Sequence, residues 1–303
     1  MNLVNIFTLG SLYADVIFFN VIYFLGLLQL YKVFYQLQPQ KKWLFVIAIF
    51  FIPSVLFWCS GIHKDGFVLA AIGFICYYTI KYMHTKRMVF LGGLFPSLLL
   101  LFMSRYFIFL CFAPPYLMWV LMASSKKRVF KFVAAYAVIV LVFFTAGNFT
   151  SIEPLEIIVA KQRDFFLLRG YSDMATPVLE PTFMSFLKNF PTAMNHIFLR
   201  PYLHPANPWK YQVAGIDSWL IFSWSVVMII FITRRNMQQL FFLMLLFFSL
   251  SMYLFIGYTT PNCGALLRYK SEITALLLPA LVALSEVPFF KRLYSNIPES
   301  FSA

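Results

Sequence analysis

Long apolar runs separated by short polar segments extend along almost the whole chain. A membrane-spanning helix needs roughly 17–25 mostly apolar residues, and nine runs approach or reach this length. They cover residues 10–31, 43–59, 67–82, 88–104, 106–123, 129–147, 218–233, 239–258 and 271–288. We expect two of these spans to meet at Arg105, because an arginine inside hydrocarbon is costly. The pattern predicts an all-α, polytopic membrane bundle of about nine transmembrane helices, forming a single transmembrane domain over residues 1–303.

The composition supports the same fold class. Of the 303 residues, 61% are hydrophobic and 12% are charged, whereas a soluble domain has about 25% charged residues. These values exclude an ordinary cytosolic enzyme, a disordered chain and a disulfide-rich secreted module. We find no glycine-rich loop of the kind that cradles nucleotide phosphates, and the sequence points to no cofactor.

The net charge of +13 is distributed unevenly between two alternating sets of polar segments. One set carries 14 of the 24 basic residues and two of the 11 acidic ones; the other set is nearly neutral. Cytoplasmic loops of membrane proteins are enriched in Lys and Arg, so we assign the basic set to the cytoplasm. The charge therefore predicts an N-terminus outside and a C-terminus inside, and it does not indicate nucleic-acid binding.

No charged segment precedes the first span, although an outside N-terminus is predicted. Two interpretations stay open. Either the start is internal and an upstream helix and loop are missing, or a short tail simply inserts with its end outside.

Residues 148–217 form the one long polar segment, predicted as an extracytoplasmic loop between the sixth and seventh spans. Within it, residues 182–199 carry apolar side chains at helical spacing, interrupted by Pro191. An amphipathic helix of this kind lies in the plane of the membrane interface. A proline-punctuated segment follows at residues 200–209.

The predicted turn between the second and third spans contains three adjacent ionisable residues, His63, Lys64 and Asp65. In the functional interpretation, His63 and Lys64 bind an anionic group at the mouth of a cavity and Asp65 acts as a base. The alternative is a solvated helical hairpin, which needs polar turn residues in any case. Both interpretations remain open.

Other outer-face cations extend the list of candidate binding residues. Arg105 either clamps a phosphate or reaches lipid headgroups. A helix is predicted to begin near Ser271, and Arg268 with this helix start would make a phosphate site, unless the two form an ordinary helix start with flanking charges. Arg163 is either a binding residue or part of a charged helical turn that simply faces solvent.

The four cysteines are Cys59, Cys76, Cys111 and Cys263, with no paired metal-binding spacing. Cys59 and Cys263 both lie near the predicted outer face, so they form a disulfide in an oxidising compartment or remain buried thiols. His196 and His204 lack a third ligand at usable spacing. We therefore predict no metal site.

The segment Phe57-Trp58-Cys59-Ser60-Gly61-Ile62-His63-Lys64-Asp65, preceded by Pro53-Ser54, resembles bacterial envelope-polysaccharide membrane proteins. The elements Arg200-Pro201 and Arg268-Tyr269-Lys270 strengthen the resemblance, which covers residues 43–80 and 190–275. The broader relatives are C-type glycosyltransferases and O-antigen-polymerase-like proteins. A catalytic acid in the first outer loop, which C-type glycosyltransferases carry, has no counterpart here.

The resemblance implies a membrane glycosyltransferase or polysaccharide polymerase in the bacterial cytoplasmic (inner) membrane. Its donor would be a polyprenyl-(pyro)phosphate-linked sugar on the outer face, with Asp65 accepting the acceptor's proton. The remaining candidate residues, His63, Lys64, Arg105, Arg163, Arg200, Arg268 and Lys270, would bind substrate, and aromatics at Trp58, Tyr171, Tyr202 and Trp209 would stack on sugar rings. Two alternatives remain: a glycolipid transporter or flippase, and a non-catalytic membrane subunit that binds partner subunits.

Overall fold

The computed structural model describes residues 11–149, 151, 153–168, 172–204, 208–237 and 239–290. This part of the chain is all-helical, as predicted, with isolated bridges as its sole β-type pairing. The helices are α2 (Leu12–Leu37), η1 (Pro39–Lys41), α3 (Lys42–Phe50), α4 (Pro53–Cys59), α5 (Lys64–Thr85), α6 (Val89–Ser104), α7 (Tyr106–Met122), α8 (Arg128–Thr145), η2 (Ala146–Asn148), α9 (Pro154–Leu167), α10 (Phe183–Leu199), α11 (Trp209–Ile230), α12 (Arg234–Met237), α13 (Leu240–Thr259) and α14 (Cys263–Leu284). Tyr171, Lys291 and Arg292, on which sequence-based expectations rested, lie outside the described residues.

Within the described residues, five helices are long and apolar enough to cross a membrane: α2, α5, α8, α11 and α13. The predicted span at residues 43–59 is instead broken, because α3 and α4 are bent by 51°. Pro53 explains the break. It has no amide hydrogen for the ladder and forces Ile52 into an extended conformation. The apolar helices α6 and α7 are shorter and separate at Arg105, as the sequence predicted.

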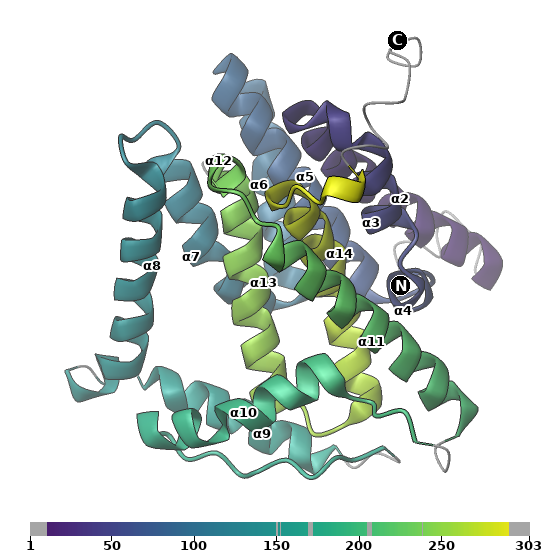
Figure 1. Ribbon diagram of the computed structural model, residues 1–303, viewed down its shortest axis with the longest axis vertical. Helices are drawn as coiled ribbons and strands as arrows, with labels where there is room; N and C mark the ends of the chain where they lie inside the picture. The colour runs from purple at the N-terminus through teal and green to yellow at the C-terminus, as the bar shows by residue number, and fades with distance from the viewer. Residues whose placement is uncertain are drawn as a thin grey trace. The chain divides into compact units, whose positions relative to one another are not determined.

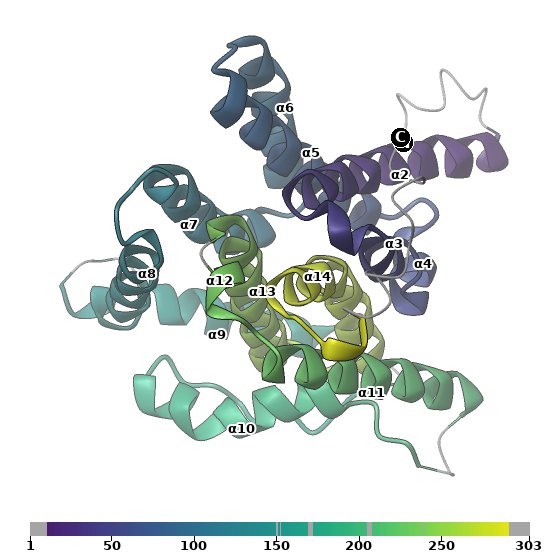
Figure 2. The same cartoon turned by 45° about the horizontal axis from the view of Figure 1, so that its top comes forward.

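The described chain divides into two compact units, each treated by itself. Unit 1 comprises the described residues 11–110, 228–236 and 274–290. Its centre is the close crossing of α2 and α5, which the reader can follow in Figure 2. A Cβ atom at Gly73 would lie 2.1 Å from the carbonyl oxygen of Gly26, and one at Gly26 would lie 2.1 Å from the Cα of Ala70. Small residues are therefore required for the two backbones to approach this closely.

A buried lysine closes the end of α14 in unit 1. Lys41 donates hydrogen bonds to the carbonyl groups of Val282 (2.9 Å), Ala283 (3.0 Å) and Ser285 (2.6 Å). Gln38 also donates to Ala283. The last carbonyl groups of a helix have no partner within it and carry partial negative charge. The ammonium group of Lys41 donates hydrogen bonds to these carbonyl groups and offsets their partial negative charge. Lys41 therefore caps the helix and is not only one of the basic residues of the predicted cytoplasmic side.

Unit 2 comprises the described residues 111–149, 151, 153–168, 172–204, 208–227, 237, 239–273. Figure 1 shows α8 and α13 running alongside each other and α9 and α10 running across their ends. Phe144 at the end of α8 makes edge-to-face contacts with Phe183 and Phe186 of α10. Tyr258 at the end of α13 donates a hydrogen bond to the carbonyl of Phe186. The predicted long loop is thus largely helical, and α10 runs through Pro191 without ending.

Candidate functional site

In unit 1, Asp65 and Arg105 form an ion pair. Asp65 is the second residue of α5, and Arg105 occupies the extended break between α6 and α7. The Asp65 side chain has no exposed surface and that of Arg105 is 9% exposed. A buried carboxylate needs a partner of opposite charge to offset its lost hydration. The structure therefore brings together two of the predicted site residues, and Asp65 does not belong to a merely solvated turn.

The turn before α5 is held against α2. Gly61 has a positive φ of 94°, and its amide donates a hydrogen bond of 2.8 Å to the side-chain oxygen of Asn20. Gly66 packs so closely that an added Cβ would lie 2.8 Å from the carbonyl oxygen of Cys59. His63 and Lys64 remain exposed at the start of α5, where the helix end favours an anion. Their predicted anion-binding role is compatible with this position and stays a prediction.

In unit 2, several charged groups lie within electrostatic range of Cys263, the first residue of α14. Arg200, at the end of α10, and Lys270, two turns into α14, both act electrostatically on the Cys263 thiol. The carboxylate of Asp217 in α11 acts on the charge of Lys270. Lys270 is 3% exposed. We call Arg200, Asp217, Cys263 and Lys270 the cation cluster; it unites two predicted binding residues that are far apart in sequence.

The segment after Arg200 is fixed against α11. An added Cβ at Gly215 would lie 2.8 Å from the Leu203 side chain and 3.0 Å from the carbonyl oxygen of Pro201. The guanidinium carbon of Arg200 lies 5.2 Å from the centre of the Tyr202 ring, within the range of a cation–π contact. These contacts set the position of Arg200 relative to the helix that carries Asp217.

The sequence-based position of the last helix start was wrong. α14 begins at Cys263 and not near Ser271. Asn262 is the residue before the helix, and its side-chain oxygen accepts a hydrogen bond of 3.1 Å from the amide of Ala265, as in a standard N-cap. Arg268 is therefore inside the helix, half-buried, and the phosphate site predicted from Arg268 and a helix terminus at Ser271 does not exist. The seventh span also starts earlier than predicted, because α11 begins at Trp209.

Arg163 occupies a different environment, on the exposed side of α9. It pairs with Glu156 at 3.0 Å, and its side chain is 61% exposed. Lys161 and Asp164 form a second, weaker pair on the same helix. This arrangement favours the interpretation of residues 161–164 as a solvated charged face.

An extended segment at residues 172–180, which we call the strap, runs between α9 and α10. Gln162 fastens it: the buried amide donates to the carbonyls of Pro177 (3.0 Å) and Tyr258 (2.7 Å) and accepts from the amide of Leu179 (2.8 Å). At its other end, Ser172 accepts a hydrogen bond of 2.9 Å from the amide of Cys263. The strap therefore connects α9 and α13 to the cation cluster.

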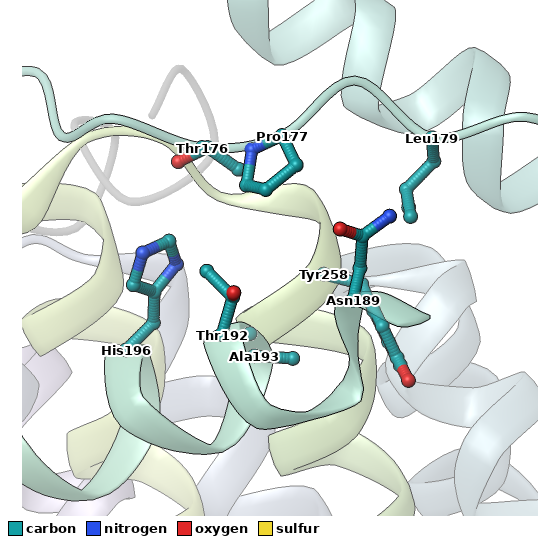
Figure 3. A pocket seen from close by; sticks show the side chains of 9 residues that line it. Thr176, Pro177, Leu179, Asn189, Thr192, Ala193, His196 and Tyr258 are labelled. Atoms are coloured by element: carbon teal, nitrogen blue, oxygen red, sulfur yellow. The ribbon is translucent and has the colours of Figure 1, made fainter. Parts of the chain in front are cut away.

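A small pocket opens between the strap and α10 (Figure 3). His196, which is 1% exposed, faces it together with Thr192 and Asn189 of α10. Burial, and next the positive charge of Arg200, lower the pKa of His196. The complete lining is Thr176, Pro177, Leu179, Asn189, Thr192, Ala193, His196, Gly257 and Tyr258.

The predicted stacking aromatics differ in exposure. Tyr202 and Trp209 are exposed in unit 2, Trp58 in unit 1 is half-buried, and Tyr171 lies outside the described residues. Within the described residues no disulfide is formed: Cys59, Cys76 and Cys263 are buried and Cys111 is partly buried.

The sequence did not indicate the roles of Asp217 and Gln162, nor that His196 faces a pocket. For Asp217 a signal existed, since an acidic residue beside a long apolar run is unusual in a membrane helix and marks a functional position.

No known protein family, curated protein or solved structure matches the chain.

Proposed function

We propose that the chain is an integral membrane protein of about nine spans, with its N-terminus outside and its C-terminus inside. The five long apolar helices and the basic cytoplasmic segments support this topology. In this arrangement α9 and α10 lie at the extracytoplasmic surface, with α10 in the membrane interface. Its exposed apolar residues Phe183, Leu187 and Phe190 would face lipid.

We further propose that the protein is a glycosyltransferase or polysaccharide polymerase that uses a polyprenyl-(pyro)phosphate-linked sugar, in a bacterial cytoplasmic membrane. Two observations support this proposal: Lys270 is a buried cation, 3% exposed, and the charges of Lys270 and Arg200 both act on the Cys263 thiol. A lipid-linked sugar brings its phosphate to the membrane surface, and two cations held in a partly buried setting stabilise the charge that develops on a leaving phosphate. Asp217 would hold Lys270 in place.

The proposed reaction transfers the sugar to a hydroxyl of a second saccharide. The bond between the sugar C1 and the phosphate oxygen breaks, and a bond forms between C1 and the acceptor oxygen. The acceptor proton passes to a general base, and Asp65 is the candidate that the sequence offers for it. His63, Lys64, Arg105, Arg163 and Arg268 are the further sequence-based candidates for binding the substrate.

The experiment measures surface-glycan chain length in host cells that carry Arg200→Gln or Lys270→Gln. We expect a fall in polymer synthesis of about 10²–10³-fold, the usual loss when one charge-stabilising donor is removed, with the lipid-linked saccharide accumulating outside. Lys210→Gln, an exposed lysine of α11, is the matched control. Accumulation of the saccharide on the cytoplasmic face would instead indicate a flippase. Unchanged glycan in both variants, at normal protein levels, would contradict the proposal.

A further inference from the structure

The pocket between the strap and α10 has a lining that selects a narrow class of ligand. Its polar side chains are those of Thr176, Thr192, Tyr258, Asn189 and His196, and the lining contains no acidic residue, lysine or arginine. Such groups exchange hydrogen bonds with neutral polar ligands, whereas an ionic ligand would find no counter-charge in the lining. The space is close to the size of one water molecule. A single hydroxyl group fits these limits.

Among the lining residues, His196 has the polar atoms whose hydrogen bonds a ligand could complete. Neither of its ring nitrogens has a hydrogen-bond partner among the described residues, and the side chain is almost completely buried. The backbones of Gly257 and Ala175 lie close to the ring without closing a well-formed hydrogen bond. A buried polar group left in this state is destabilising, and a hydroxyl placed in the pocket would supply the missing hydrogen bond.

The pocket also has a defined position relative to the cation cluster. Thr192 and His196 are four residues apart on one face of α10, and Arg200 directly follows the last residue of this helix. The strap that covers the pocket continues to Ser172, which binds the amide of Cys263. A sugar whose phosphate reaches Arg200 therefore lies about one helical turn from His196.

We propose that this pocket binds one hydroxyl group of the sugar whose phosphate the cation cluster holds, with His196 and Thr192 as its hydrogen-bonding residues. This inference rests on the proposed function and adds to it a subsite that selects among sugars. A site built to bond a hydroxyl strongly rejects analogues that lack it, because its buried polar groups are then left unpaired.

The first test measures the initial rate of polymer synthesis in membrane vesicles that contain the host's own lipid-linked saccharide. Thr192→Val keeps the shape of the side chain and removes the hydroxyl; His196→Leu removes both nitrogens, and His196→Gln retains hydrogen-bonding capacity. We expect a rate about tenfold lower or more for the first two variants and a smaller loss for His196→Gln. Lys188→Gln, an exposed change on the same helix, should match wild type, and unfolding temperatures identify any variant that fails to fold.

The results separate this inference from the proposed function. Wild-type rates for Thr192→Val and His196→Leu, together with a large loss for Arg200→Gln, would overturn the pocket assignment alone. If Arg200→Gln and Lys270→Gln keep the wild-type rate, the function itself fails. The pocket is then tested by hydrogen exchange with a panel of methyl glycosides at millimolar concentration. Protection of the amides of residues 174–180 that Thr192→Val abolishes supports a sugar pocket, and no protection by any glycoside overturns it.

Discussion

Asp65 and Arg105, forty residues apart in sequence, form a buried ion pair in which the carboxylate has no exposed surface. The pairing ties the start of α5 to the break between α6 and α7. Asp65 is also the proposed base, so structural and catalytic roles must be separated experimentally.

Removing one partner of this pair should lower the stability of the protein strongly. For Asp65→Asn and Arg105→Met we expect a loss of about 3–5 kcal/mol, because each removes one partner of a buried ion pair. The double variant Asp65→Leu/Arg105→Met should recover much of the loss, since well-packed apolar residues often replace a buried pair without cost. Thermal unfolding in detergent measures both effects, with the exposed change Lys64→Gln as control. A double variant that regains stability and also full polymer synthesis would show that Asp65 is not the base.

Because α2 and α5 cross closely, substitution of Gly73 in α5 should lower the stability of the protein, whereas the same substitution at Gly92 in α6 should not. Gly73→Ala should destabilise the protein by about 1–3 kcal/mol or more, because its Cβ would lie 2.1 Å from a backbone oxygen that cannot move aside. Gly92→Ala should be neutral or stabilising by about 0.5–1 kcal/mol, since no atom lies within 4 Å and alanine favours the helix. Unfolding temperatures of the two variants in parallel test this, and equal effects would show that the crossing is looser than described.

Lys41 should contribute to stability through the end of α14. Lys41→Met removes the donor of three hydrogen bonds to backbone carbonyls. We expect a loss of about 2–4 kcal/mol, because bonds from charged donors are stronger than neutral ones and the carbonyls are buried. Lys32→Met, at an exposed lysine of α2, should change stability little. Similar unfolding temperatures for the two variants would contradict the capping role.

His196 should make stability depend on pH in a specific window. Burial and the charge of Arg200 lower its pKa in the folded protein, whereas the unfolded chain binds a proton near pH 6.5. Folding therefore releases a proton below about pH 6.5, and the His196 contribution to stability falls as the pH decreases from there towards the lower folded pKa. The unfolding temperature of wild type, measured between pH 7.5 and 5, should fall more steeply than that of His196→Gln. Parallel curves would show that His196 is not held in its neutral form.

The apolar pattern predicted most helices to within a few residues, because apolar runs are a local signal. It failed where polar residues lie inside helices. Arg268 and Lys270 concealed the first two turns of α14, and Lys210 and Asp217 concealed the start of α11. The broken span at Pro53 was missed because its two short helices together have the length and polarity of one span.

The site residues were predictable as individual charges but their grouping was not. Asp65 and Arg105, or Arg200 and Lys270, come together through helix packing, which leaves no periodic signal in one sequence. Gln162 was overlooked for a related reason: a single amide within a charged stretch gives no sign that it is buried and fastens the strap. The function of Lys41 as a helix cap was likewise hidden, because positive-inside counting treats all loop cations alike.

Reconstitution of the purified protein in liposomes that contain the host's polyprenyl-pyrophosphate-linked saccharide tests the central claim most directly. We predict that mass spectrometry will detect lipid-linked products longer by whole saccharide units, together with released polyprenyl pyrophosphate. Arg200→Gln and Lys270→Gln should reduce both products about 10²–10³-fold, while Lys210→Gln should not. Folded wild-type protein that yields neither elongated saccharide nor released pyrophosphate carrier would contradict the assignment of glycosyl transfer to this chain.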